Sequence, residues 1–139
     1  MNADAIIIEA KRAKAELEKR YAQALELLAD EKKSDDCLIK VEELVKQIPK
    51  GSKFAPYVKD VRLLILMVRS YISGEYKDIP VTTIVAAVSA LVYVLSPLDI
   101  IPDNIPVVGF ADDAAVVAYL MKSIEKDIKK YEDWRKKNK

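Results

Sequence analysis

With 139 residues, 51% hydrophobic and 32% charged, the chain is long enough to bury a core as one domain and too apolar to remain disordered. Its formal net charge of +1 gives no overall field that would attract nucleic acid, so we expect no such partner. It has no histidine and one cysteine, Cys37, which excludes Ser-His-Asp and Cys-His triads, ordinary zinc sites and an intramolecular disulfide.

The first half of the chain is predicted to form three amphipathic helices, because hydrophobic residues recur every three or four positions. These helices are expected over residues 3–33, 34–48 and 55–73. Ser34, Asp35 or Asp36 has the side chain that suits the N-cap of the second helix. Gly74 should end the third helix, since glycine readily takes the left-handed conformation that follows a helix.

Two further helices are predicted in the second half. The fourth is expected over residues 78–95, with Asp78 as its cap and Pro80 in its first turn, and Ser96 with Pro97 should end it. The fifth is expected over residues 112–136. Five helices with short connections predict a compact all-α bundle. We expect a single domain over residues 1–139, with charged N-terminal helices over 1–53 and a core over 54–139.

The fourth predicted helix is apolar enough to raise the question of a membrane span. Residues 79–98 contain no charged side chain, and about 20 apolar residues can cross a bilayer. However, Pro80 and Pro97 restrict the helical part to residues 81–96, which span about 24 Å against a hydrocarbon core of about 30 Å. We therefore expect the central helix of a bundle, and an anchor over residues 79–98 is the alternative.

The segment 96–113 is apolar, rich in proline and free of basic residues, so we expect it to be ordered between the fourth and fifth helices. Its acids are Asp99, Asp103, Asp112 and Asp113. Their carboxylates could accept hydrogen bonds from backbone N–H groups in turns and at the start of the fifth helix. They are also the oxygen ligands that Mg²⁺ or Ca²⁺ prefers, so a divalent-cation site is the alternative.

The same segment carries a specific sequence pattern. Residues 93–113 read YVLSPLDIIPDNIPVVGFADD, which contains S-P-x-D-x-I-P-D and then I-P-x-x-G-x-x-D-D. From about Pro56 to Leu120 the chain resembles the YkvA-like family of small bacterial proteins, a domain of unknown function. The signature falls on Ser96, Pro97, Asp99, Ile101, Pro102, Asp103, Pro106, Gly109, Asp112 and Asp113. The resemblance implies no particular reaction, and it implies a link with membranes because some relatives are described as membrane-associated.

Charge is unevenly distributed, with eight basic and four acidic residues over 122–139. A solvated helix face explains this first, and a patch for anionic lipid or nucleic acid second. The N-terminal residues lack the pattern of a secretory signal, so we expect a cytoplasmic protein, with membrane association as the alternative. Together these features predict a non-enzymatic helical domain that associates with itself, another protein or a membrane surface. No cofactor is expected beyond the Mg²⁺ or Ca²⁺ alternative.

Overall fold

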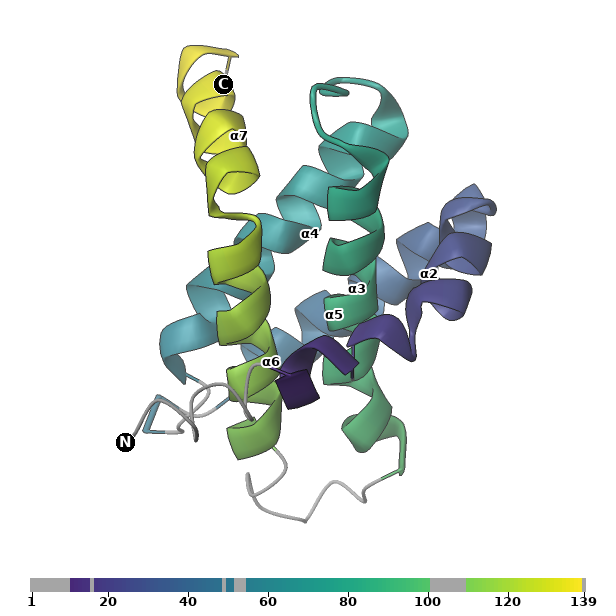
Figure 1. The fold of residues 1–139 in the computed structure, drawn as a ribbon, viewed down its shortest axis with the longest axis vertical. Helices are drawn as coiled ribbons and strands as arrows, with labels where there is room; N and C mark the ends of the chain where they lie inside the picture. Colours follow the sequence, from purple (N-terminus) through teal and green to yellow (C-terminus); the bar gives the residue numbers. More distant parts are fainter. Residues whose placement is uncertain (1–10, 16, 49, 52–54, 101–109, 139) are drawn as a thin grey trace.

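The computed structural model describes the backbone of residues 11–15, 17–48, 50–51, 55–100 and 110–138, and the side chains of those residues apart from 96–100 and 110–115. Within these ranges the chain forms helices and no strand, which confirms the predicted all-α class. The helices are α2 (Tyr21–Leu28), α3 (Glu31–Lys46), the 3-10 helix η1 (Ala55–Tyr57), α4 (Val58–Ser73), α5 (Val81–Ile100), α6 (Phe110–Ser123) and α7 (Glu125–Asn138), preceded by helical residues 11–15 and 17–18 (Figure 1).

The helix predicted over residues 3–33 is not continuous in its described part. Turns at residues 19–20 and 29–30 divide it, so the described chain has more helices than the five predicted. The buried residues Ala13, Leu17 and Ala24 keep helical spacing across the first turn. Hydrophobic periodicity therefore gives no sign of this interruption.

The second turn ends at the true N-cap of α3, which is Asp30. Its carboxylate accepts hydrogen bonds from the backbone N–H groups of Lys32 and Lys33 at 3.1 and 3.2 Å. The cap predicted within residues 34–36 is therefore wrong. Ser34 lies inside α3, and its hydroxyl donates a hydrogen bond to the carbonyl of Leu27, so it joins α3 to the end of α2.

The helix predicted over residues 55–73 is confirmed, because η1 and α4 together cover it. Gly74 follows with φ of 86°, which is the left-handed conformation that glycine adopts at low cost. The next helix, α5, begins after Pro80, whose carbonyl accepts hydrogen bonds from the backbone N–H groups of Thr83 and Ile84 at 3.0 and 3.2 Å. Asp78, the predicted cap, forms an ion pair with Lys130 of α7.

The predicted end of the fourth helix at Ser96 and Pro97 is wrong, because α5 continues to Ile100. A proline inside a helix removes one backbone hydrogen bond and crowds the carbonyl four residues earlier, at a cost of about 3 kcal/mol. Pro97 stands in the last turn of α5, where little helix remains beyond it to be disrupted. The penalty therefore does not stop the helix at that residue.

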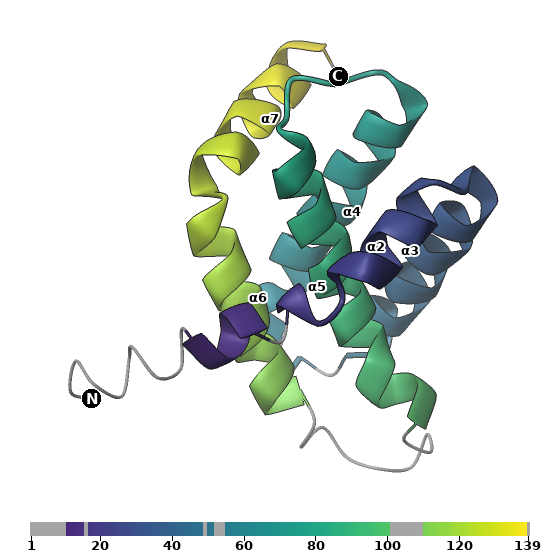
Figure 2. The ribbon, with the colours of Figure 1, turned by 45° about the vertical axis from the view of Figure 1, so that its right-hand side comes forward.

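The single helix predicted over residues 112–136 is two helices, α6 and α7, which meet at a turn at Ile124. The hydroxyl of Ser123 donates a hydrogen bond to the carbonyl of Leu120 at 2.8 Å, while the backbone N–H of Ile124 donates to the same carbonyl at 3.0 Å. A side chain that competes for a helix carbonyl in this way often bends the helix. Figures 1 and 2 show the resulting change of direction between α6 and α7.

The helix α5 lies in the middle of the molecule, packed against α2, α3, α4 and α6 (Figures 1 and 2). Apolar side chains point outward from α5 on several sides and meet other helices, because eight of its described apolar residues are at most 8% exposed: Ile84, Val85, Ala87, Val88, Ala90, Leu91, Val92 and Val94. This is the burial that the sequence predicts for a central helix. Among the described residues, no helix has the length and hydropathy needed to cross a bilayer.

Candidate functional site

The C-terminal helix α7 is attached to the bundle by its apolar face. Tyr131 is 1% exposed and its hydroxyl lies 2.8 Å from the hydroxyl of Ser70 on α4, so the two share a hydrogen bond. The ring of Tyr131 also packs against Tyr76, which follows α4, and against Trp134, with ring centroids 5.3 and 5.9 Å apart. Tyr76 and Trp134 lie 4.9 Å apart and complete the cluster. Aromatic groups in these arrangements attract one another beyond the simple burial of their area.

Two polar contacts join α7 to the start of α5 and to the residues just before it. The hydroxyl of Thr83 donates a hydrogen bond to Oδ2 of Asp127 at 2.6 Å. The ammonium group of Lys130 lies 2.7 Å from Oδ2 of Asp78, and the hydrogen bond raises the pKa of Lys130. Both side chains of this ion pair are more than half exposed, so solvent screening keeps its contribution to stability small. These contacts fix which face of α7 points to solvent.

Tyr76 has the one buried side-chain oxygen or nitrogen without a hydrogen-bond partner among the described residues. The residue is 6% exposed, and its burial, followed by the charge of Asp78, raises its pKa. A buried hydroxyl that loses its hydrogen bonds to water destabilises the folded state.

We expect Tyr76→Phe to raise the free energy of unfolding by about 1 kcal/mol, because it removes the unpaired hydroxyl and keeps the ring. The difference in free energy of unfolding between this variant and the wild type should grow at alkaline pH. The unfolded chain releases the tyrosine proton from a pKa of about 10, before the folded chain does, so wild-type stability falls above that pH and the phenylalanine variant escapes this loss. Urea denaturation at pH 7 and pH 10.5 measures both effects. A loss of stability at pH 7 would mean that the hydroxyl has a partner.

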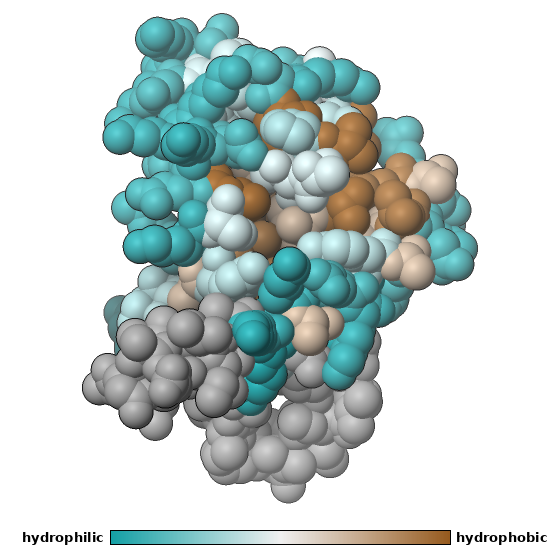
Figure 3. All heavy atoms as spheres, in the orientation of Figure 1, coloured by the Kyte–Doolittle hydropathy of each residue, from teal (hydrophilic) through white to brown (hydrophobic). Residues whose placement is uncertain are grey.

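The opposite face of α7 carries four exposed lysines, Lys126, Lys129, Lys136 and Lys137. At about 100° per residue they fall within an arc of about 100°, and along the axis they extend over about 17 Å. Asp133 is the acidic residue within the same arc, so this outer lysine face has a net charge of +3. Hydrophilic residues cover the surface over α7, at the upper left of Figure 3.

The four aspartates that are predicted to cap turns or bind a cation have side chains that lie outside the described residues. Asp103 lies outside the described residues. The backbone places Asp99 in the last turn of α5 and Asp112 with Asp113 in the first turn of α6, but their side chains also lie outside the described residues. Among the described residues no group of three Asp, Glu, Cys or His could hold a metal ion. Capping and cation binding by these four aspartates both stay predictions.

A family model described as "protein of unknown function (DUF1232)" matches residues 83–119, from the first turn of α5 into α6. The chain is also 37% identical over 78 residues to a Bacillus subtilis (strain 168) protein called "uncharacterized membrane protein YkvA", and the aligned part covers 56% of this chain and 74% of that protein. The chain belongs to the DUF1232 family. The YkvA-like resemblance is thereby confirmed. No solved structure shows a significant match.

The DUF1232 match and the outer lysine face occupy different parts of the chain. The match ends at Tyr119, and α7 begins at Glu125. The family description therefore assigns nothing to the lysines. The sequence shows their excess of charge, and projecting residues 125–138 on a helix would have placed them on one face. Their exposure depends on the packing of Tyr131 and Ile128 on the other face.

Proposed function

We propose that this DUF1232 protein is a non-enzymatic, cytoplasmic domain that binds the surface of an anionic membrane through the outer lysine face of α7. The observation that carries the proposal is the position of Lys126, Lys129, Lys136 and Lys137, all exposed on one side of a helix whose other side is fixed to the bundle. A rigid helix can bring all four charges to a flat surface together without first paying the entropy of ordering.

The net charge of the outer lysine face provides a binding free energy that suits weak, reversible binding to a membrane. A lysine near an anionic membrane surface contributes about 1 kcal/mol, so a net charge of +3 contributes about 3 kcal/mol. This attraction is screened within about 8 Å at physiological ionic strength, so binding should weaken as salt is added. The name of the Bacillus subtilis relative, which calls that protein a membrane protein, agrees with a role at membranes.

We expect the protein to co-sediment with vesicles of phosphatidylcholine and phosphatidylserine, but not with vesicles of phosphatidylcholine alone. Replacing the four lysines of the outer face by glutamate should abolish this binding, because the face becomes acidic and is repelled. The matched control replaces four exposed lysines on other elements, Lys11, Lys33, Lys40 and Lys59, which changes the net charge equally. The control should keep most of the binding.

Two results would contradict the proposal. Equal losses in both variants would show that net charge alone controls binding. Binding to neutral vesicles that resists high salt and survives the four substitutions would instead favour the anchor over residues 79–98.

A further inference from the structure

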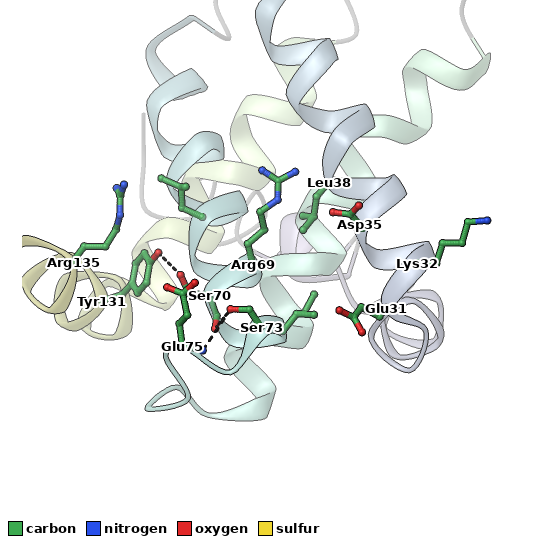
Figure 4. Close-up of a pocket in the computed structure, with 12 residues that line it drawn as sticks. Glu31, Lys32, Asp35, Leu38, Arg69, Ser70, Ser73, Glu75, Tyr131 and Arg135 are labelled. Atoms are coloured by element: carbon green, nitrogen blue, oxygen red, sulfur yellow. Dashed lines mark hydrogen bonds between the residues drawn. The ribbon is translucent and has the colours of Figure 1, made fainter. Parts of the chain in front are cut away.

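A cleft of about 750 Å³ opens between α3, α4 and α7 (Figure 4). Binding sites for small organic molecules have volumes in the same range, from about 300 to about 1,000 Å³. The floor of the cleft is α4, and α3 and α7 form its two walls. Neither the DUF1232 match nor the outer lysine face includes these residues, so neither accounts for the cleft.

The middle of the cleft offers hydrogen-bond donors. Ser70 is half-buried there, and its hydroxyl shares a hydrogen bond with the buried hydroxyl of Tyr131 at 2.8 Å. Either oxygen can be the donor, so Ser70 can accept from Tyr131 and turn its own proton toward a ligand. Arg69 forms an ion pair with Glu42, and its guanidinium has more N–H groups than this pair uses. Such a floor suits the carbonyl groups of a peptide backbone.

Charged residues surround this floor. The cations of the lining are Lys32, Arg69 and Arg135, and the acids are Glu31, Asp35 and Glu75. The ion pair with Glu42, which lies outside the cleft, takes up the charge of Arg69, so the other five leave a net charge of −1. A ligand with a net charge of +1 therefore complements the cleft.

The wall formed by α3 favours a cation. Glu31 and Asp35 are exposed and lie one turn apart on the same side of α3. Lys32 belongs to the same wall, but Figure 4 shows its side chain extending away from the other labelled residues. An ammonium group that enters the cleft on this side therefore meets two carboxylates.

The side of the cleft next to α7 carries charges of both signs. Arg135 is half-buried on α7. Glu75 follows α4 and precedes Tyr76, whose ring packs against Tyr131 of α7, so Glu75 lies on this side as well. A ligand carboxylate that binds Arg135 is repelled by Glu75 unless the ligand also brings a cation. A C-terminal lysine residue supplies both groups, because it has a carboxylate and an ammonium.

The distance between the walls sets the length of the ligand. The walls stand on either side of α4, so a molecule that reaches both must span about 10 Å, the diameter of one helix. Three extended amino-acid residues have a length of about 10 Å.

We propose that this cleft binds free tripeptides with a basic C-terminal residue. The N-terminal ammonium pairs with the carboxylates of the α3 wall, and the backbone carbonyls accept hydrogen bonds from the floor. The C-terminal residue places its carboxylate on Arg135 and its side-chain ammonium on Glu75. With both termini charged and one lysine, such a peptide has the net charge of +1 that complements the lining. The proposal is independent of the outer lysine face.

Nuclear magnetic resonance titration of isotope-labelled protein with the tripeptide Ala-Ala-Lys tests it, because chemical shifts report both the affinity and the place of binding. The amide signals of Ser70 and Arg135 should shift saturably. Three matched peptides each lack one charge: N-acetylation removes the terminal ammonium, C-terminal amidation removes the carboxylate, and norleucine in place of lysine removes the side-chain ammonium. Each should bind roughly fivefold more weakly, because one charge-assisted hydrogen bond is lost at a partly exposed site.

Substitutions on each wall should cancel the effect of one peptide change. Glu31→Gln with Asp35→Asn should bind the free and the acetylated peptide equally, and Arg135→Gln should bind the free and the amidated peptide equally. None of the three side chains is fully buried, so the fold should persist, and circular dichroism checks this. The controls, Asp36→Asn and Lys136→Gln, neutralise exposed neighbours that do not line this cleft, and they should leave every affinity within about twofold.

The proposal is overturned if no peptide causes saturable shifts, if the shifts map outside the cleft, or if the amidated peptide binds the wild type as tightly as the free one. Equal binding of the acetylated peptide would also overturn it, because the site would then take the C-terminus of a protein chain rather than a free peptide. The variant with four glutamates on the outer lysine face separates the two proposals, because it should lose vesicle binding and keep tripeptide binding.

Discussion

Replacing Tyr131 by alanine should lower the free energy of unfolding by about 4 kcal/mol, which is among the largest effects expected of one substitution in this chain. The side chain is 1% exposed and packs against Tyr76 and Trp134, so its removal leaves a cavity beneath α7. The hydroxyl of Ser70 also loses its partner. Urea denaturation followed by far-ultraviolet circular dichroism measures the loss.

Tyr131→Phe is the matched control. It keeps the ring and removes only the hydrogen bond to Ser70, so the expected loss is about 1 kcal/mol. If Tyr131→Ala and Tyr131→Phe lower the free energy of unfolding by the same amount, the packing of the ring does not hold α7 to the bundle. That result would also weaken the membrane-surface proposal, which needs α7 to be fixed.

The existence of the helices could be predicted from the sequence, but several of their ends could not. Gly74 ends α4 as predicted, because a left-handed residue after a helix is a local requirement that glycine meets. The cap at Asp30 was not predicted, since hydrophobic spacing runs on through it and residues 34–36 offer side chains of equal quality. At Pro97 the sequence predicts the end of a helix, but α5 continues to Ile100. A proline disfavours a helix without forbidding it in the last turn.

The candidate sites differ in how far the sequence reveals them. The excess of lysine near the C-terminus is visible in the sequence, and the spacing of Lys126, Lys129, Lys136 and Lys137 is enough to place them on one face of a helix. The cleft of about 750 Å³ between α3, α4 and α7 could not be found this way. It joins Glu31 and Asp35 to Arg135, about a hundred positions away in the sequence, and only the packing of α3 and α7 around α4 brings them together.

Leu91→Ala tests whether α5 owes its apolar character to the bundle. Leu91 is 1% exposed in the middle of α5, which packs against helices on several sides, so the substitution should lower the free energy of unfolding by about 3 kcal/mol in buffer without detergent or lipid. The cost comes from lost contacts and from a cavity that rigid neighbours cannot fill. If lipid tails surrounded this helix instead, they would close over the smaller side chain and no such cavity would form.

The matched control lies on the same helix. Val81 is 58% exposed at the start of α5, so Val81→Ala removes little buried surface and should change the stability by no more than about 0.5 kcal/mol. A large loss at Leu91 with almost none at Val81 is the result that helix burial within the bundle requires. Similar small changes at both positions in aqueous buffer would mean that the helices around α5 do not pack against it as described, and the anchor over residues 79–98 would then become the better explanation of its composition.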